Sequence, residues 1–265
     1  MRNLAERLTA IAGSVLFCFT VPAFGQTTIN FTGITNSQVF GGGYVDPYAG
    51  TVTYNGAPVS NGGLIVCDDY KDEIYIPETW NVTAIQASSL NSSNIGETLF
   101  GSAIGLDGYA AVASLVADLL SSSSQSTQAD LSSAIWWITS GWIDPDSNYS
   151  LSGYPLDPAA VGYITSALTA YGPFGQGDDT TAANTALAAD TNLWVLTPIS
   201  GTQSTGGPPQ EMWIQVSNSS PDYTPLFSNV PEGGTALTYL LLAGATCFGA
   251  VYFNSRSRLG RAETA

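Results

Sequence analysis

An uncharged apolar run near the C-terminus constrains this chain more than any other feature, because such a run has few alternatives to a membrane span. Thr235 to Phe253 contains no charged residue. As a helix it would be roughly 28 Å long, close to the thickness of the hydrocarbon core. Arg256, Arg258 and Arg261 follow at once, and positive charge just beyond a span favours the cytoplasmic side. We therefore predict one transmembrane helix over 235–253.

A short motif, Val230-Pro231-Glu232-Gly233-Gly234, directly precedes this run. The order of Pro-Glu motif, single span and arginine cluster resembles the PEP-CTERM sorting tail of exported proteins in biofilm-forming Gram-negative bacteria. The resemblance covers 230–261 and implies recognition by an exosortase-type enzyme in the inner membrane, removal of the span, and delivery to the cell envelope surface or extracellular matrix. A plain C-terminal anchor is the alternative. The residues that match the sorting motif are Val230, Pro231, Glu232, Arg256, Arg258 and Arg261.

The other end of the chain, residues 1–25, has the composition of a signal peptide. Arg2 and Arg7 precede an apolar core from Ala10 to Val21, which is too short for an ordinary membrane span. Ala23-Phe24-Gly25 supplies small residues for cleavage before Gln26. A short uncleaved anchor is the alternative. Together the two ends predict an exported protein whose single domain covers 26–229.

The charge balance of this domain excludes several classes of function. The chain carries a formal net charge of −15, and Lys71 is the only basic residue between Gln26 and Asn229. Such an acidic surface repels nucleic acid, so we predict no DNA or RNA partner. The sequence contains no histidine, which removes Ser-His and Cys-His nucleophile–base pairs and the usual zinc and haem ligand sets. We therefore predict no cofactor and no turnover enzyme.

Hydrophobic periodicity predicts an α+β fold, in which N- and C-terminal strands form a β-sandwich or barrel-like sheet around a helical insertion at about 97–190. Alternating and β-rich pieces fill Thr27 to Ala87, with a turn at Asn55-Gly56. Helical spacing follows, and strand patterns then return. The expected helices are Leu99–Leu120, Thr127–Thr139, a third from Asp157-Pro158 to about Tyr171, and Thr181–Ala189; the expected late strands are Leu193–Ile199 and Glu211–Val216.

Cysteine usage singles out one residue. Cys18 and Cys247 lie in the two terminal apolar segments, so the exported domain keeps only Cys67. A lone cysteine in an oxidising compartment cannot form an internal disulfide. The simplest interpretation is a buried cysteine that acts as a small hydrophobic residue.

Three short motifs give Cys67 another interpretation. They are Ile65-Val66-Cys67-Asp68-Asp69-Tyr70, Leu131-Ser132-Ser133-Ala134-Ile135-Trp136 and Pro209-Gln210-Glu211-Met212-Trp213-Ile214. Their order resembles the thioester domains of Gram-positive surface adhesins, in which an early cysteine forms an internal thioester with a late glutamine, and a Thr-Gln-x-Ala-Ile-Trp motif lies on a helix between them. The resemblance spans about 39–216 and implies that Cys67 and Gln210 are the bonded pair.

The resemblance also assigns neighbours to that pair, with one departure. Trp136, Trp137 and Trp213 are candidates for aromatic walls that exclude water. The glutamine of the helical motif is replaced by Ser132, and Gln128, one turn earlier, is a candidate substitute. A thioester stores an acyl group that an outside amine can capture. The implied function is adhesion or matrix attachment, with an extracellular polysaccharide or a surface amine-bearing ligand as partner.

Weaker signals leave other functions open. Asp68, Asp69, Asp72 and Glu73 could be the paired carboxylates of a glycan hydrolase, although a solvated acidic loop is the simpler interpretation. Asp144, Asp146 and Asn148 begin like a calcium loop but lack its glycine and closing glutamate, so a turn is the better interpretation. A non-covalent structural or carbohydrate-binding matrix protein with an inert Cys67 also remains open.

Overall fold

The fold is taken from a computed structural model of the whole chain. It describes residues 26–41, 43–59, 63–70, 76–141, 149–151, 153–175, 181–202, 204 and 210–216. The predicted signal peptide, sorting motif and transmembrane helix lie outside these residues, and so do Lys71, Asp144, Asp146 and Asn148.

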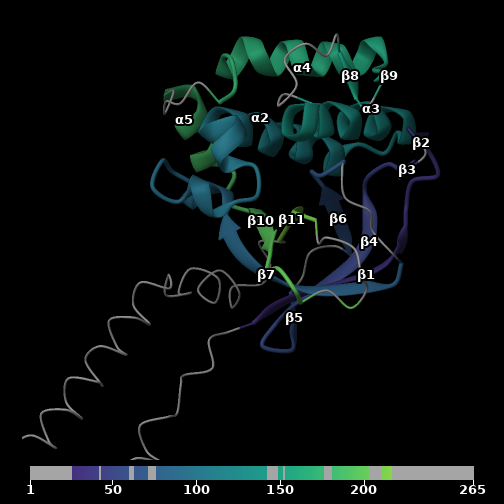
Figure 1. Cartoon of the computed structure of the whole chain (residues 1–265), viewed down its shortest axis with the longest axis vertical. Helices are drawn as coiled ribbons and strands as arrows, with labels where there is room; N and C mark the ends of the chain where they lie inside the picture. Colours follow the sequence, from purple (N-terminus) through teal and green to yellow (C-terminus); the bar gives the residue numbers. More distant parts are fainter. Residues whose placement is uncertain are drawn as a thin grey trace, which may run out of the picture. The chain divides into compact units, whose positions relative to one another are not determined.

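An antiparallel β-barrel forms the lower layer of the domain in Figure 1. The strands follow the order β1-β7-β10-β11-β6-β4, and pairing of β4 with β1 closes the barrel. A short strand, β5, adds to the outer edge of β4. The bounds of these strands are β1 Thr27–Ile34, β4 Tyr48–Tyr54, β5 Ala57–Val59, β6 Leu64–Cys67, β7 Glu78–Gln86, β10 Leu193–Pro198 and β11 Met212–Gln215.

Alternation along these strands separates two hydrophobic cores. On β6, Ile65 and Cys67 belong to a cluster with Phe31 and Trp80, whereas Val66 belongs to a cluster made largely of helical residues. Because side chains on a strand point alternately to opposite faces, one core fills the barrel and the other lies between the barrel and the helices. At the ends of β6 and β11, successive residues therefore point alternately into the barrel core and toward the helical core.

Helices form the second layer, above the barrel in Figure 1. They are α2 Gly101–Ser121, α3 Gln125–Trp136, α4 Pro158–Tyr171 and α5 Thr181–Ala189. Short 3-10 helices η2 Ala87–Ser89 and η3 Ile95–Glu97 precede them, and a π-helical segment, η4 Trp137–Gly141, continues α3. The predicted α+β class, with strands from both ends of the chain and helices between them, is confirmed at this level.

Local sequence signals explain where several elements begin and turn. Asp157 caps α4, because its carboxylate accepts from the Ala159 backbone N–H at 2.9 Å, and Pro158 occupies the first helical turn. Ser124 caps α3 in the same way. Asn55 and Gly56 both have positive φ, as a two-residue hairpin turn between β4 and β5 requires.

Two small hairpins sit beside the helical layer. They are formed by β2 Val39–Phe40 with β3 Gly43–Tyr44, and by β8 Ser150–Leu151 with β9 Tyr154–Pro155. Neither hairpin was predicted, since each strand is only two residues long and carries no periodic signal.

The helix α2 is long and apolar enough to cross a membrane, but most of it is buried inside the domain. It contains the largest block of the helical core, including Tyr109 and Val116. Gly105, with a φ of 65°, interrupts its first turns. A buried core helix satisfies the same length and hydropathy criteria as a span.

Candidate functional site

The two residues of the predicted thioester lie together at the end of the barrel that faces the helices. Cys67 is the last residue of β6, and Gln210 precedes β11 by two positions. These strands are antiparallel neighbours with Met212 opposite Cys67, so both residues reach the same end. Cys67 Sγ lies 2.9 Å from Gln210 Oε1. Both residues are buried, with 1% and 3% of their surface exposed.

The main chain of Asp69 holds both reacting groups. Its N–H donates to Cys67 Sγ at 3.3 Å, and its carbonyl oxygen accepts from Gln210 Nε2 at 3.2 Å. The Cys67 thiol also lies 3.1 Å from that carbonyl oxygen. A backbone donor on the sulfur favours the thiolate, while the carbonyl orients the amide. The amide carbon, bonded to Oε1, is therefore held close to the sulfur.

The backbone of Cys67 is fixed by side chains from two other elements. Asp46, in the loop between β3 and β4, accepts from the Cys67 N–H through Oδ1 at 2.7 Å. Trp136, the last residue of α3, donates from Nε1 to the Cys67 carbonyl oxygen at 2.9 Å. Trp136 also contacts the ring of Tyr70. The predicted tryptophan thus borders the site and positions the cysteine as well as excluding water.

The two candidates for the missing motif glutamine occupy different places. Ser132 Oγ accepts from the Asp46 backbone N–H at 3.1 Å, so it supports the residue that contacts Cys67. Gln128 donates to the Ser122 carbonyl oxygen at 2.8 Å and accepts from Asn36 at 3.4 Å. Ser132 is therefore linked to the Cys67 site through Asp46, whereas these bonds of Gln128 join the start of α3 to the loop at Asn36.

A second buried pair, Asp68 and Glu211, lies next to the first. Each residue follows one member of the Cys67–Gln210 pair in sequence, and the Asp68 backbone N–H donates to the Glu211 carbonyl oxygen at 3.4 Å. Because of the strand alternation, their side chains face the helical core. Asp68 Oδ2 accepts from Trp213 Nε1 at 2.7 Å. The predicted wall residue Trp213 thus contacts Asp68.

Three donors surround the Glu211 carboxylate. The Leu99 backbone N–H donates at 2.8 Å, Thr197 Oγ1 donates at 2.5 Å, and the Tyr109 hydroxyl also donates. Burial raises the pKa of Glu211, but these donors oppose that rise. Burial raises the pKa of Asp68 well above its usual range, and the adjacent Glu211 carboxyl raises it further. Asp68 is therefore the acid of the pair that keeps its proton more readily, and Glu211 is the acid whose charged form the donors favour.

Asp46 and Cys67 share the same dry surroundings. Burial raises the pKa of the Asp46 carboxyl well above its usual range, opposed by the Cys67 N–H and the Ser132 hydroxyl. Burial also raises the pKa of the Cys67 thiol, and the negative charge of Asp46 adds to this rise. A thiol with a raised pKa stays protonated at neutral pH, so attack by its sulfur requires a group that removes the proton.

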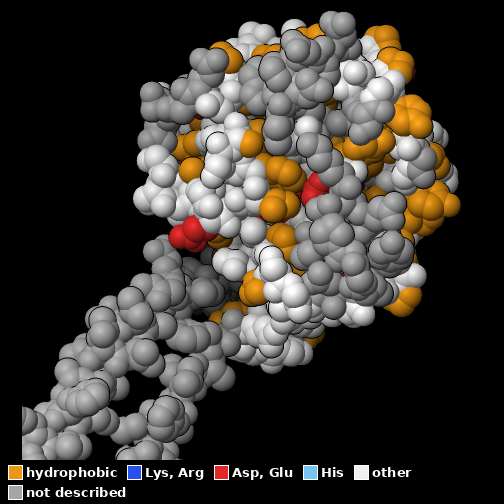
Figure 2. All heavy atoms as spheres, viewed as in Figure 1, with side chains coloured by type: hydrophobic (Ala, Val, Ile, Leu, Met, Phe, Trp, Pro, Cys, Tyr) orange, Lys and Arg blue, Asp and Glu red, His pale blue; other side chains and the backbone are white. Residues whose placement is uncertain are grey.

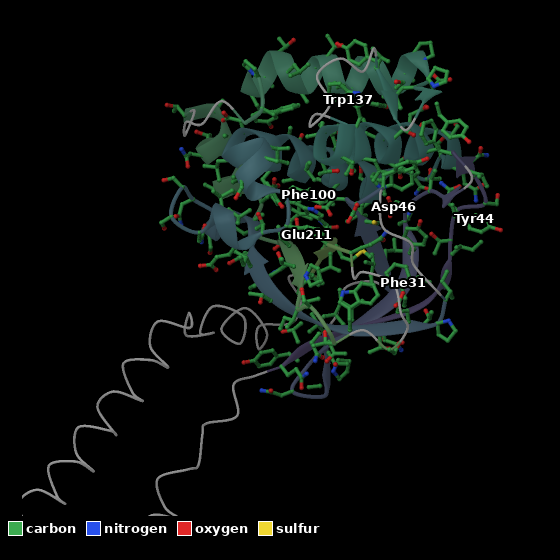
Figure 3. The ribbon with its side chains drawn as sticks, in the orientation of Figure 1. Phe31, Tyr44, Asp46, Phe100, Trp137 and Glu211 are labelled. Carbon is green, nitrogen blue, oxygen red and sulfur yellow. The ribbon has the colours of Figure 1, made fainter. Side chains whose placement is uncertain are left out.

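Figure 3 shows Asp46 and Glu211 at the level where the helices meet the barrel, with Phe31 deeper in the barrel and Trp137 in the helical layer. The described residues include no Lys, Arg or His, so none of the described side chains is a cation that could neutralise these acids. No group of three or more His, Cys, Asp or Glu suited to a metal ion occurs among the described residues.

One expectation about the acids was wrong. A solvated loop was the simpler interpretation of the acidic cluster, but Asp68 and Asp69 are only 0% and 4% exposed. The physical reason is that the π-helical end of α3 covers them: Thr139 donates to the Asp68 carbonyl oxygen, and Ser140 accepts from the Tyr70 N–H. Asp72 and Glu73, the other two acids of this cluster, lie outside the described residues.

Sequence reasoning missed three residues of this region. Glu211 could have been noticed, because it lies two residues before Trp213. In an extended segment the two side chains point to the same face, which is the buried one at Trp213. Tyr109 could be recognised only as a core residue of α2. Asp46 lies in a loop with no motif, and only the tertiary fold brings it to Cys67.

Comparisons with protein-family models, with curated proteins and with solved structures found no match to this chain.

Proposed function

We propose that this protein is an exported surface or matrix adhesin whose domain forms an internal thioester between Cys67 and Gln210 and captures an amine-bearing partner covalently. The observation that supports this most directly is the 2.9 Å contact between Cys67 Sγ and Gln210 Oε1 in a buried site. Reacting groups held at about 3–3.5 Å in a fixed orientation gain much of the advantage of an intramolecular reaction.

The chemistry needs only groups that the site contains. The sulfur attacks the amide carbon of Gln210, ammonia leaves, and the acyl group remains on Cys67. Burial of both residues slows hydrolysis of the product. An amine of the partner then attacks the thioester, which leaves an amide on Gln210 and a free thiol on Cys67. Each molecule reacts once, so the protein is not a turnover enzyme.

Export is the second part of the proposal and is supported by the sequence of the two ends. Residues 1–25 have the composition of a signal peptide, and 230–261 match the order of a PEP-CTERM sorting tail. Processing by an exosortase-type enzyme would remove the span after transient anchoring in the inner membrane. The domain would then reach the envelope surface or matrix, where a covalent bond to a polysaccharide or surface amine is useful.

Intact mass of the full-length chain purified in detergent tests the thioester. We expect a mass lower by one ammonia than the mass of the processed or unprocessed sequence. Trypsin can cut only after Lys71 between the two residues, so rapid digestion should leave the Cys67 and Gln210 peptides joined. Methylamine should separate them, place a methylamide on Gln210 and expose the Cys67 thiol.

Matched variants complete this test. Cys67→Ala and Gln210→Ala should restore the full mass, whereas Gln215→Ala, at an exposed glutamine of β11, should keep the loss of ammonia. A wild-type chain of unchanged mass whose Cys67 is freely alkylated in denaturant would overturn the thioester.

A second candidate, non-covalent carbohydrate binding, is favoured by one observation. A row of aromatic rings runs from Trp136 through Tyr70 and Phe40 to Tyr154, which is 51% exposed. Aromatic rings with an exposed face can stack on sugars. Figure 2 shows apolar side chains spread among uncharged polar surface on the face in view.

Glycan-array binding by the Cys67→Ala variant tests this candidate. Retained binding that is lost in Cys67→Ala/Tyr154→Ala would support it. Absence of binding on a broad array would exclude the second candidate and leave the covalent function unaffected.

A further inference from the structure

The attack of the Cys67 sulfur requires transfer of a proton, and the carboxyl of Asp46 is placed to carry it. Asp46 Oδ1 accepts from the Cys67 backbone N–H at 2.7 Å, so the carboxyl lies against the residue that must lose its thiol proton. Only the Cα and Cβ atoms separate that nitrogen from Sγ.

The second oxygen of the same carboxyl is available. Asp46 is fully buried, and its Oδ2 has no hydrogen-bond partner. A buried carboxyl oxygen without a donor is costly, and it calls for an explanation. One explanation is that this oxygen accepts a proton transiently from the neighbouring Cys67 thiol.

The backbone of Asp46 is held firmly, as a proton carrier requires. The Asn36 side chain donates to the Asp46 carbonyl oxygen at 3.1 Å, and Ser132 accepts from the Asp46 N–H at 3.1 Å. These contacts fix the loop between β3 and β4 against α3. The carboxyl therefore has a defined position beside Cys67.

The neighbouring acids are less suited to this role. The charged carboxylate of Glu211 is occupied by three donors and faces the helical core. Asp68 accepts from Trp213 through Oδ2; its Oδ1, like Asp46 Oδ2, is buried without a hydrogen-bond partner, but the Asp68 side chain faces the helical core. Cys67 instead belongs to the core inside the barrel. Asp46 contacts the Cys67 backbone directly and keeps one oxygen unpaired.

We propose that Asp46 is the proton carrier for formation of the Cys67–Gln210 thioester, an inference that rests on the proposed function. The thiol S–H bond breaks as the bond from sulfur to the Gln210 amide carbon forms, and the proton passes to Asp46 Oδ2. The amide C–N bond then breaks, the proton moves from Asp46 to the departing nitrogen, and ammonia leaves. Thiol and amide become thioester and ammonia, and Asp46 returns to its starting state.

The environment suits this role in both directions. Burial raises the pKa of Asp46 well above its usual range, which makes its carboxylate a stronger base toward the thiol. The same carboxyl, once protonated, is the acid that would return the proton to the leaving nitrogen, in a site where Cys67 and Gln210 are both buried. No oxidant, reductant or metal ion takes part in the step.

The test is the rate at which newly made chains lose ammonia, followed by intact mass during cell-free synthesis of the full chain in detergent. Asp46→Asn keeps an acceptor for the Cys67 N–H but cannot carry the proton. We expect thioester formation to slow by about 100-fold or more, the usual contribution of a positioned acid or base. Asp118→Asn, the same substitution at an exposed position of α2, should form the thioester at the wild-type rate.

A folding control separates chemistry from stability. The thermal midpoints of Cys67→Ala and Cys67→Ala/Asp46→Asn, neither of which can form the bond, should agree closely. If Asp46→Asn fails to fold, the pair Asp46→Glu and Asp46→Gln replaces it, since both have the same shape and only the first carries a proton. Faster formation in Asp46→Glu than in Asp46→Gln supports the inference.

Two outcomes would overturn the inference, and they are distinguishable. Formation at the wild-type rate in a folded Asp46→Asn, or equal rates in the Glu and Gln variants, would exclude Asp46 as the carrier and leave the proposed function intact. A wild-type chain that never loses ammonia would remove the proposed function and this inference together.

Discussion

Two buried polar pairs occupy neighbouring positions at the ends of the same two strands, and they differ in which groups hold their side chains. Asp68 and Glu211 face the helical core, where Trp213 binds one acid and three donors bind the other. Cys67 and Gln210 are held chiefly by the main chain of Asp69 and contact each other directly. A shift of one residue along each strand thus separates two acids that bond to several other elements from a pair whose members contact each other.

The difference shows how bonds on one face of two strand ends can fix the position of side chains on the other face. The acid pair fixes the ends of β6 and β11 relative to α2 and the loop at Leu99, since Glu211 bonds to both. A rigid neighbouring network keeps Cys67 and Gln210 at contact distance on the other face. We therefore expect substitutions of the acid pair to lower stability, and substitutions of Cys67 or Gln210 to prevent the proposed bond.

The largest effect is expected from opening the proposed bond. Cys67 and Gln210 are 143 positions apart in sequence, and a cross-link across such a loop constrains the unfolded chain. By the chain-entropy model for disulfides, opening it should lower the free energy of unfolding by about 5 kcal/mol. Urea unfolding before and after methylamine treatment measures this change.

Cys67→Ala serves as the control, because its unfolding should not respond to methylamine. An equal stability loss in the control would show that methylamine acts elsewhere, and no loss in the wild type would contradict a cross-link.

The next largest loss of stability is expected from a change in the Asp68–Glu211 pair. Glu211→Gln replaces a charged acceptor of three hydrogen bonds by an amide whose NH2 group must face donors. We expect the variant to lose about 3 kcal/mol of unfolding free energy, because buried donors remain unsatisfied. Urea unfolding measures it, with Glu97→Gln on η3 as a matched control. Equal stability of wild type and Glu211→Gln would show that the three donors are not essential.

Asp68→Asn should behave in the opposite way, because an asparagine resembles the protonated acid that the fold requires. Its NH2 group can donate to Glu211, and its oxygen can accept from Trp213. We therefore expect Asp68→Asn to lose much less unfolding free energy at neutral pH than Glu211→Gln. Such a result would show that the two acids have different roles.

The raised pKa of Asp68 also predicts how the free energy of unfolding changes with pH. The folded-state pKa of Asp68 is raised above its unfolded value of about 3.9. Below that value both states hold the proton. As the pH rises from about 4 toward the folded pKa, only the folded state keeps the proton, so stability falls by about 1.4 kcal/mol per pH unit. Urea unfolding at several pH values should show a shallower fall in Asp68→Asn; an identical slope would contradict a protonated Asp68.

Much of the fold could be predicted from sequence, and the reason lies in local signals. The expected helix at 181–189 coincides with α5, and the third helix begins at Asp157-Pro158 as its capping pattern predicts. The second helix was placed at Thr127–Thr139, but α3 spans Gln125–Trp136, since Ser124 caps its start and the π-helical turn replaces its end. Within the stretch expected to be β-rich, Thr27 to Ala87, the last strand, β7, begins at Glu78 and ends at Gln86.

The candidate site was only partly predictable, because its pieces are joined by long-range packing. Cys67 and Gln210 could be paired only through the family resemblance, since nothing local links residues so far apart. The closure of β1 on β4 and the burial of Asp68 depend on tertiary contacts that no periodic pattern encodes. The same holds for Asp46, whose side chain reaches Cys67 only when α3 packs against the β3–β4 loop.

The smallest effect is expected at Ser132, the serine that stands where the thioester family has glutamine. Its hydroxyl accepts from the Asp46 N–H and lies 0% exposed. Ser132→Ala should cost about 1 kcal/mol of unfolding free energy, the usual value for one hydrogen bond. Ser132→Gln places a larger side chain at this fully buried position, so overpacking should make it less stable than Ser132→Ala. Urea unfolding of both variants measures the difference, and greater stability of Ser132→Gln would show that the site accommodates a glutamine at this position.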